Sequence, residues 1–437
     1  MADGGYDAVA AGAAAGNTVF AGTVLAVNEL TARWARESAV PGENTVLSAV
    51  GVWPLLAFLG GAAEGTARGE LAAALGVSPP TAIARGRELL EILGAQDGLA
   101  AALGVWTRDE VKPREEWLSR LPPAVTGRLT GEPATDRAAL DAWADRGTGG
   151  LVPRLPLEVS AETLLVLASA LSVRTAWRQP FRPGWMRPES GPWQRRELAG
   201  LRRLDTDLDE VAVAATPRGP LTVLAVRGDG GIDVHLLLGG PEQAPGAVIE
   251  AGTLALAGAY ESVPGSLLPE GDAGPGVKVG YVASPVPEAT LAVSTPAFTV
   301  GADHDLLARA ELFGLVGAAD PGQGHFPGIS DIPLAVGQAR QAVTAAFRAE
   351  GFEAAAVTAF ALAAGGAAPR ERARTVSVDF ERPFGFLAVH RTSGLVLAAG
   401  WVAEPEQAVL RGGGPPWPAA RETQNARDAA AEEDGGW

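Results

Sequence analysis

The feature that most constrains this chain is an apolar segment of small residues between two stretches that have the pattern of strands. Residues 351–366 read GFEAAAVTAFALAAGG and carry a single charge, at Glu353. Before this segment, residues 343–347 alternate in the two-residue period of a half-buried strand. After it, two alternating runs on either side of a Thr-Ser-Gly turn at 392–394 predict a hairpin of core strands. Since connecting loops run over the wet surface, a loop this apolar is unusual.

Two conformations fit the segment, and the residues alone leave both open. Ala is the best helix former, and Phe352, Ala356 and Phe360 recur at the four-residue spacing of a helix face. In a strand, the even-numbered residues from Phe352 to Leu362 would share one face, and Glu353 would point to the other. A segment of the second kind can enter a sheet as an added strand.

The rest of the chain mixes strands and helices without strict alternation, which predicts an α+β fold. The nearly continuous apolar run 164–173 is expected to be a strand buried on both faces. An alternating strand is expected over 291–300, a helix over 303–312, and irregular structure over 182–205. Residues 1–16 are expected to form a loose arm before a helix that starts at Asn17, and 406–437 a flexible tail.

Composition excludes several classes of function. The net charge of -16 argues against binding to a nucleic-acid backbone, which needs clustered Lys and Arg. The absence of Cys excludes disulfides and cysteine-ligated metals, so the redox compartment is not readable. No apolar run reaches the roughly 20 residues that span a membrane, and we expect no membrane partner. The first residues lack the basic region and apolar core of a secretory signal, which favours a cytoplasmic location.

The sequence offers no constellation that points to an enzyme, a cofactor or a metal. The four histidines have no metal-ligand spacing, and we find no nucleophile motif or phosphate loop. The acidic run DTDLDE at 205–210 lacks the glycine and closing Glu of a calcium loop, so a solvated strand edge is favoured over a cation site.

Several blocks of sequence resemble the serpins, the serine protease inhibitor superfamily, and follow one another in family order over roughly residues 17–405. Two of these blocks lie near the end of the chain, the hinge-like GFEAAAVTA and the closing FERPFGFLAVHRTSGLVLAAGWVAEP. The others come earlier and read ENTVLSAVGVWPLLAFLGGAAEGTARGELAAALG, LDAWADRGTGGLVPRL, LLVLASALSVRTAWRQPF, and STPAFTVGADHDLLARAELFGLVGAAD with FPGIS. The resemblance implies a single domain over 17–405, with eight or nine helices around three mostly antiparallel sheets. It also implies an exposed reactive-centre loop over about 349–377, and we expect a monomer of the bacterial type.

In serpins the loop is bait for a target serine or cysteine protease, and after cleavage it inserts into the main sheet and traps the acyl-enzyme. The resemblance therefore implies a suicide inhibitor without a cofactor, and secretion is common in the family. Carried over by position, the hinge comprises Gly351, Phe352, Glu353, Ala354, Ala355, Ala356, Val357 and Thr358. The region where the sheet opens comprises Ser48, Ser169, Trp177 and Gln341. A Ser before a helix is also an ordinary N-cap, and a Trp is an ordinary core residue.

This chain departs from the family at several of these positions. Phe352 stands where inhibitory members carry Thr or another small residue, and overpacking a tight site costs about 1–3 kcal/mol. Phe352 therefore leaves open a non-inhibitory serpin-fold binding protein or a protease substrate. Ala349 replaces a hinge Glu, and Gly51 replaces a Ser. Ser169 and Gln341 stand where Asn and His are common, so the hydrogen bonds of the opening region must differ.

Two ways of counting give different reactive bonds. Counting forward from the hinge points to Ala364, Gly365 and Gly366, which suit an elastase-like or subtilisin-like protease. Counting back from Pro383 points to Arg372, and with Arg370 it would suit trypsin-like proteases. We favour the first, because the arginines lie too far from the hinge for a tight drag.

Overall fold

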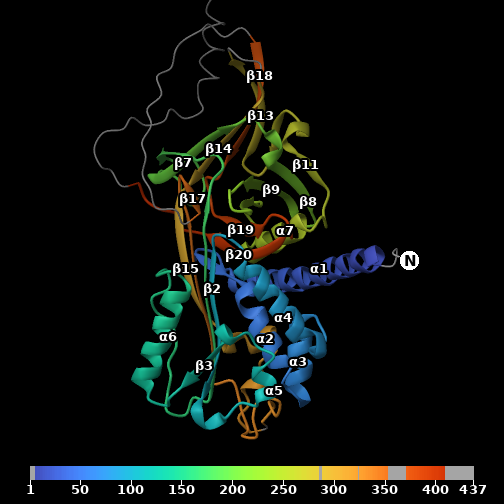
Figure 1. The fold of residues 1–437 in the computed structure, drawn as a ribbon. Helices are drawn as coiled ribbons and strands as arrows, with labels where there is room; N and C mark the ends of the chain where they lie inside the picture. The colour runs from blue at the N-terminus through green and yellow to red at the C-terminus, as the bar shows by residue number, and fades with distance from the viewer. Residues whose placement is uncertain (1–4, 285–287, 323, 353–370, 409–437) are drawn as a thin grey trace, which may run out of the picture.

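The computed structural model describes residues 5–284, 288–322, 324–352 and 371–408. Within these ranges the chain forms eight α-helices and three sheets (Figure 1), which confirms the α+β fold class. The helices are α1 (Gly5–Ser38), α2 (Ala49–Gly60), α3 (Gly65–Leu75), α4 (Pro79–Gly94), α5 (Glu115–Leu118), α6 (Pro133–Gly147), α7 (Pro245–Leu256) and α8 (Ala310–Phe313).

The main sheet runs down the middle of the molecule. Its strand order is β3 (Thr126–Leu129), β2 (Leu99–Arg108), β4 (Leu165–Val173), β16 (Gln338–Phe347), β17 (Gly351–Phe352) and β5 (Thr175–Ala176), and β15 (Phe298–Asp305) pairs with β16. All nine residues of β4 are buried, as the apolar run predicts. The two central strands, β4 and β16, run parallel and are paired directly from Val166↔Gln338 to Ser172↔Thr344.

The other two sheets lie toward the end of the molecule where β18 projects (Figure 1). The second sheet contains β1 (Thr45–Leu47), β20 (Leu395–Val402), β19 (Phe384–His390), β10 (Ile232–Leu238), β9 (Gly219–Val226), β8 (Val211–Thr216) and β11 (Ser262–Pro264). It confirms the hairpin around 392–394, which is formed by β19 and β20. The third contains β12 (Gly271–Gly274), β13 (Val277–Ser284), β18 (Glu371–Asp379), β14 (Thr290–Pro296), β7 (Leu198–Asp205) and β6 (Arg182–Met186).

The core lies between the main sheet and the β19–β20 hairpin. Phe298 of β15 stacks on Phe347 of β16 with ring centroids 5.4 Å apart, and it contacts Phe386 of β19 at 5.1 Å. Helix α2, buried along its whole length, contacts β2, β4 and β20. Helix α6 covers the opposite face of the main sheet with Leu140 and Ala144 (Figure 1).

Four expectations about local structure are wrong. Helix α1 begins at Gly5 and not at Asn17, since the alanines of the expected arm favour a helix. Residues 182–205 contain β6 and β7, and Pro183 is tolerated because β6 is an edge strand. Over 303–312, sheet pairing with β16 extends β15 to Asp305, so the expected helix is wrong at its start, and helical structure begins at Leu307 with a 3-10 turn (Leu307–Arg309) before the short α8. The chain also stays paired beyond residue 405, where the nitrogen of Ala408 donates to the carbonyl of Glu197.

Within the described part of the chain, every helix is too short or too polar to cross a lipid bilayer.

Candidate functional site

The first two residues of the expected hinge, Gly351 and Phe352, follow a tight turn between β16 and β17. Phe347 and Phe352 face each other as antiparallel partners, and the nitrogen of Arg348 donates to the carbonyl of Gly351 over 2.9 Å. On its other side β17 pairs with β5, through Gly351↔Ala176 and Phe352↔Thr175. At this end of the main sheet β17 therefore lies between β16 and β5. Further from the turn, β16 pairs directly with β4.

Phe352 is fully buried and lies in the core behind this end of the sheet. Its ring meets Phe386 of β19 edge-on at 6.0 Å. The bulk of this side chain is thus accommodated in the folded state.

Trp177 holds the turn from the β5 side and is also part of the core, being 3% exposed. Its indole Nε1 donates to the carbonyl of Arg348 over 2.9 Å, and its backbone nitrogen donates to Glu350 over 2.9 Å. Its ring lies 4.8 Å from that of Phe347. The nitrogen of Phe181 adds a bond of 2.7 Å to the carbonyl of Ala349.

Ser48, Ser169 and Gln341 meet where the central strands are paired directly. Gln341 of β16 and Ser169 of β4 are register partners, and Gln341 Nε2 lies 3.3 Å from Ser169 Oγ. The same amide donates to the carbonyl of Ser48 over 2.8 Å, and its Oε1 accepts from the nitrogen of Ser48 over 3.0 Å. All three side chains are buried. A single glutamine thus joins both central strands to the start of α2.

Two neighbours explain how this cluster fits together. Ser48 occupies the N-cap position of α2 but does not cap it with its side chain, because its hydroxyl donates to the carbonyl of Leu397 over 2.7 Å. A Cβ at Gly51 would lie 2.5 Å from Ser169 Oγ and 3.0 Å from Gln341 Nε2. Glycine at 51 therefore leaves the space that these polar side chains occupy.

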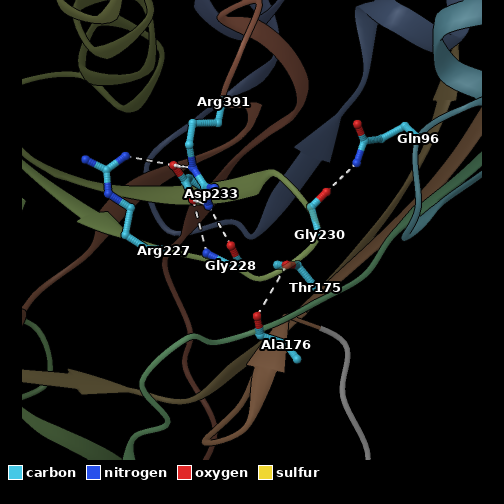
Figure 2. A network of polar contacts seen from close by, with 8 residues as sticks. All are labelled: Gln96, Thr175, Ala176, Arg227, Gly228, Gly230, Asp233 and Arg391. Atoms are coloured by element: carbon cyan, nitrogen blue, oxygen red, sulfur yellow. Dashed lines mark hydrogen bonds and ion pairs between the residues drawn. The ribbon is translucent and has the colours of Figure 1, made fainter.

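Figure 2 shows a polar network that sequence reasoning missed, beside β5. The carboxylate of Asp233, 1% exposed, accepts hydrogen bonds from Arg391 Nε over 2.8 Å, Arg227 Nη1 over 2.8 Å and the nitrogen of Gly228 over 3.0 Å. Burial alone would raise the pKa of Asp233, but these hydrogen bonds hold it below its usual value. Because Gly228 forms an isolated bridge with Trp177, the network supports the residue that directly follows β5.

The acidic run at 205–210 ends in a buried ion pair, so the expected solvated edge is wrong for Glu210. Glu210, 8% exposed, pairs with Arg203, and the guanidinium of Arg203 lies 5.0 Å from the ring centroid of Phe181. In the described ranges no three His, Cys, Asp or Glu gather as a metal site. Burial raises the pKa of Glu210 to about 7, although the charge of Arg203 acts to lower it.

This raised pKa predicts a specific pH dependence of stability. The unfolded carboxyl titrates near 4.3, so the folded state binds the proton more tightly, and the contribution of Glu210 to stability is lost as pH rises toward 7. The unfolding free energy of the wild type, relative to Glu210→Gln, should fall by about 2–3 kcal/mol between pH 5 and pH 8. Urea unfolding of both chains measures it, and a difference that stays flat would contradict it.

The candidate reactive bonds fall partly within the described residues. Glu353 to Thr358, Ala364, Gly365, Gly366 and Arg370 lie outside them. Arg372 lies in β18, paired with Ala283 of β13, and its guanidinium sits 5.4 Å from the ring of Tyr281. Residues 371–377, expected as part of the loop, are therefore strand, because β13 and β14 pair with them.

Comparisons with known proteins agree with this geometry. The family model described as Serpin (serine protease inhibitor) matches residues 25–190 and 283–405. Serpin-Z6C of Oryza sativa subsp. japonica is 24% identical over 414 residues, which cover 86% of this chain and 94% of that protein.

Solved structures share the fold. Native protease nexin-1 with heparin has a TM-score of 0.67 at 16% identity, covering 89% of this chain and 100% of its own. Tengpin, a thermophilic serpin in the native state, has a TM-score of 0.67 at 14% identity, covering 87% and 94%. A serpin from the trematode Schistosoma haematobium has a TM-score of 0.63 at 14% identity, covering 88% and 99%.

Proposed function

This chain belongs to the serpin family, and we propose that it is a suicide inhibitor of serine or cysteine endopeptidases. The nucleophile of the target attacks the carbonyl carbon of the reactive bond, the C–N bond breaks, and an acyl-enzyme forms. The freed end of the hinge then enters the main sheet and carries the protease with it before water can release it. The bacterial type, the monomeric state and the lack of nucleic-acid partners stay predictions.

The observation that carries this proposal is the position of β17. Strand β17 lies between β16 and β5, so the first residues of the proposed hinge already occupy one end of the position that a new strand would take in the main sheet. Away from β17 the two central strands pair directly with each other, and no described strand separates them. Insertion would extend an existing hairpin downward, which avoids the entropy cost of closing a new one.

The register of β17 fixes where each inserted residue would lie. Antiparallel partners keep a constant sum, so Phe347↔Phe352 continues to Gln341↔Thr358, since 347 + 352 equals 341 + 358. On the other side, Thr175↔Phe352 continues to Ser169↔Thr358, since 175 + 352 equals 169 + 358. Thr358 would thus arrive between Ser169 and Gln341, where its hydroxyl can replace the hydrogen bond that insertion breaks.

The same register supports a reactive bond in the Ala364–Gly366 region. Ala361 would oppose Gln338, the first residue of β16, because 338 + 361 equals 347 + 352. A bond after Gly365 leaves four residues (365 minus 361) between the sheet and the protease, so full insertion would pull the protease close to the end of the sheet. A bond after Arg372 would leave eleven (372 minus 361), and Arg372 is also held in β18.

The test is complex formation with a panel of endopeptidases. Elastase-like and subtilisin-like enzymes, which have small specificity pockets, should give an adduct that survives boiling in denaturant. The same enzymes with a blocked active-site serine are the matched control and should give none. Mass spectrometry of the released peptide identifies the cleaved bond.

Cleavage without a stable adduct by every enzyme of the panel would contradict inhibition. It would favour the alternative, a non-inhibitory serpin-fold binding protein or a plain protease substrate. The buried position of Phe352 makes that alternative less attractive, since the ring is already seated in the core.

A further inference from the structure

The hinge turn is also held from the β15 side, by a residue just past the segment that the family model matches. The guanidinium of Arg348 binds the carboxylate of Glu406 through Nη1, and its Nη2 donates to Thr299 Oγ1 over 2.7 Å. The hydroxyl of Thr299 in turn donates to Glu406 Oε1 over 2.7 Å. The three side chains form a closed triangle of polar contacts, and the family match ends at residue 405.

The backbone of Glu406 is itself fixed in place. Its nitrogen donates to the carbonyl of Ala297 over 3.0 Å, and its carbonyl accepts from the nitrogen of Ala199 over 2.9 Å. Its side chain is about one-third exposed, at 29%, and that of Arg348 is 39% exposed. The carboxylate therefore projects from a rigid point toward the turn, which lessens the entropy that a free surface ion pair must lose.

We infer that Glu406 is a positioning residue for loop insertion, because it holds the turn between β16 and β17 in the shape from which the inserted strand grows. Trp177 and Phe181 fix the backbone of the turn from the β5 side, and Glu406 fixes Arg348 from the β15 side. With both anchors in place, the first pair, Phe347↔Phe352, stays formed while the following residues pair with β16 one after another. This inference rests on the proposed function.

Losing the carboxylate should let the turn fray and slow insertion. We expect Glu406→Gln to insert about two to five times more slowly than the wild type, the upper part of the range for a partly exposed charged contact. Since insertion competes with hydrolysis, the same variant should release more cleaved chain for each complex that it forms. Its uncut form should unfold within about 2 °C of the wild type, because a partly exposed pair adds little to overall stability.

The rate can be followed without reference to inhibition. The chain has no Cys, so Val357→Cys offers a single site for an environment-sensitive fluorophore on the hinge. Mixing with excess protease starts insertion, and the fluorescence change gives its rate. Glu404→Gln is the matched control, since Glu404 lies on the same segment but pairs with Arg196, away from the turn. The reversed pair Arg348→Glu with Glu406→Arg should recover part of the rate lost in Glu406→Gln.

Two results would overturn this role of Glu406. One is equal insertion rates for Glu406→Gln and Glu404→Gln; the other is a reversed pair no faster than Glu406→Gln. A labelled Val357→Cys chain with Glu406 intact that is cut without any fluorescence change would instead overturn the proposed function itself, so the two failures are distinguishable.

Discussion

A single cut in the Ala364–Gly366 region should raise the melting temperature of this protein by about 10–20 °C. In the uncut chain the central strands β4 and β16 are paired directly, and β17 supplies only two residues of an added strand. Inserting roughly ten residues would form about ten new backbone hydrogen bonds, each worth about 0.5–1.5 kcal/mol. The total is of order 10 kcal/mol, which matches the stability of a whole domain and accounts for the expected rise.

Calorimetry before and after limited proteolysis measures this rise, with the cleaved bond identified by mass spectrometry. A sample cut only after residue 408, beyond the last described residue, is the control and should melt like the intact chain. A chain whose melting temperature is unchanged after a complete cut would mean that the sheet does not accept the hinge. The non-inhibitory alternative would then be the better account.

The elements that the sequence predicts well are those whose local pattern and sheet environment agree. Strand β4 is buried on both faces, which is what its nearly continuous apolar run predicts, and the strand patterns of β19 and β20 agree with their place in the core of the second sheet. Residues 303–305 were expected to be helical, but pairing with β16 overrides that local preference. A pairing between strands far apart in sequence leaves no mark in an eight-residue window.

In the region where the sheet is expected to open, the sequence predicted the residues but not their contacts. The family resemblance pointed to Ser48, Ser169 and Gln341, and these residues lie together. Their residue types did not indicate that the amide of Gln341 would bind both serines. The pairing of Asp233 with Arg391, 158 positions away, and the burial of Glu210 were not readable from the sequence. Charged residues are mostly exposed, so a lone Asp or Glu is expected in water unless its partner is known.

Replacing Ala356 with Glu should abolish inhibition and leave a protease substrate. In the register of β17, Ala356 would lie between Val343 and Leu171, on the face that buries Phe352, since 343 + 356 equals 347 + 352. Those neighbours are 2% and 0% exposed, so the new carboxyl would enter the sheet without water or a partner. A fully buried carboxyl with its pKa raised by 3–5 units is protonated at neutral pH, and burying it there costs roughly 3–4 kcal/mol. A barrier raised by that amount slows insertion about a hundredfold to a thousandfold, so hydrolysis of the acyl-enzyme wins.

Ala355→Glu is the matched control, one position away and on the opposite face. Ala355 would lie opposite Thr344, which lines an open groove of about 310 Å³ together with Leu151 and Arg154. A carboxylate there keeps access to water, so this variant should inhibit nearly as well as the wild type. Titrating a fixed amount of protease with each variant gives the number of chains consumed per enzyme trapped. Because a strand that slips by one residue exchanges its faces, the opposite ranking of the two variants would show that the hinge enters in the other register. Equal and undiminished inhibition by both would mean that these residues never enter the sheet.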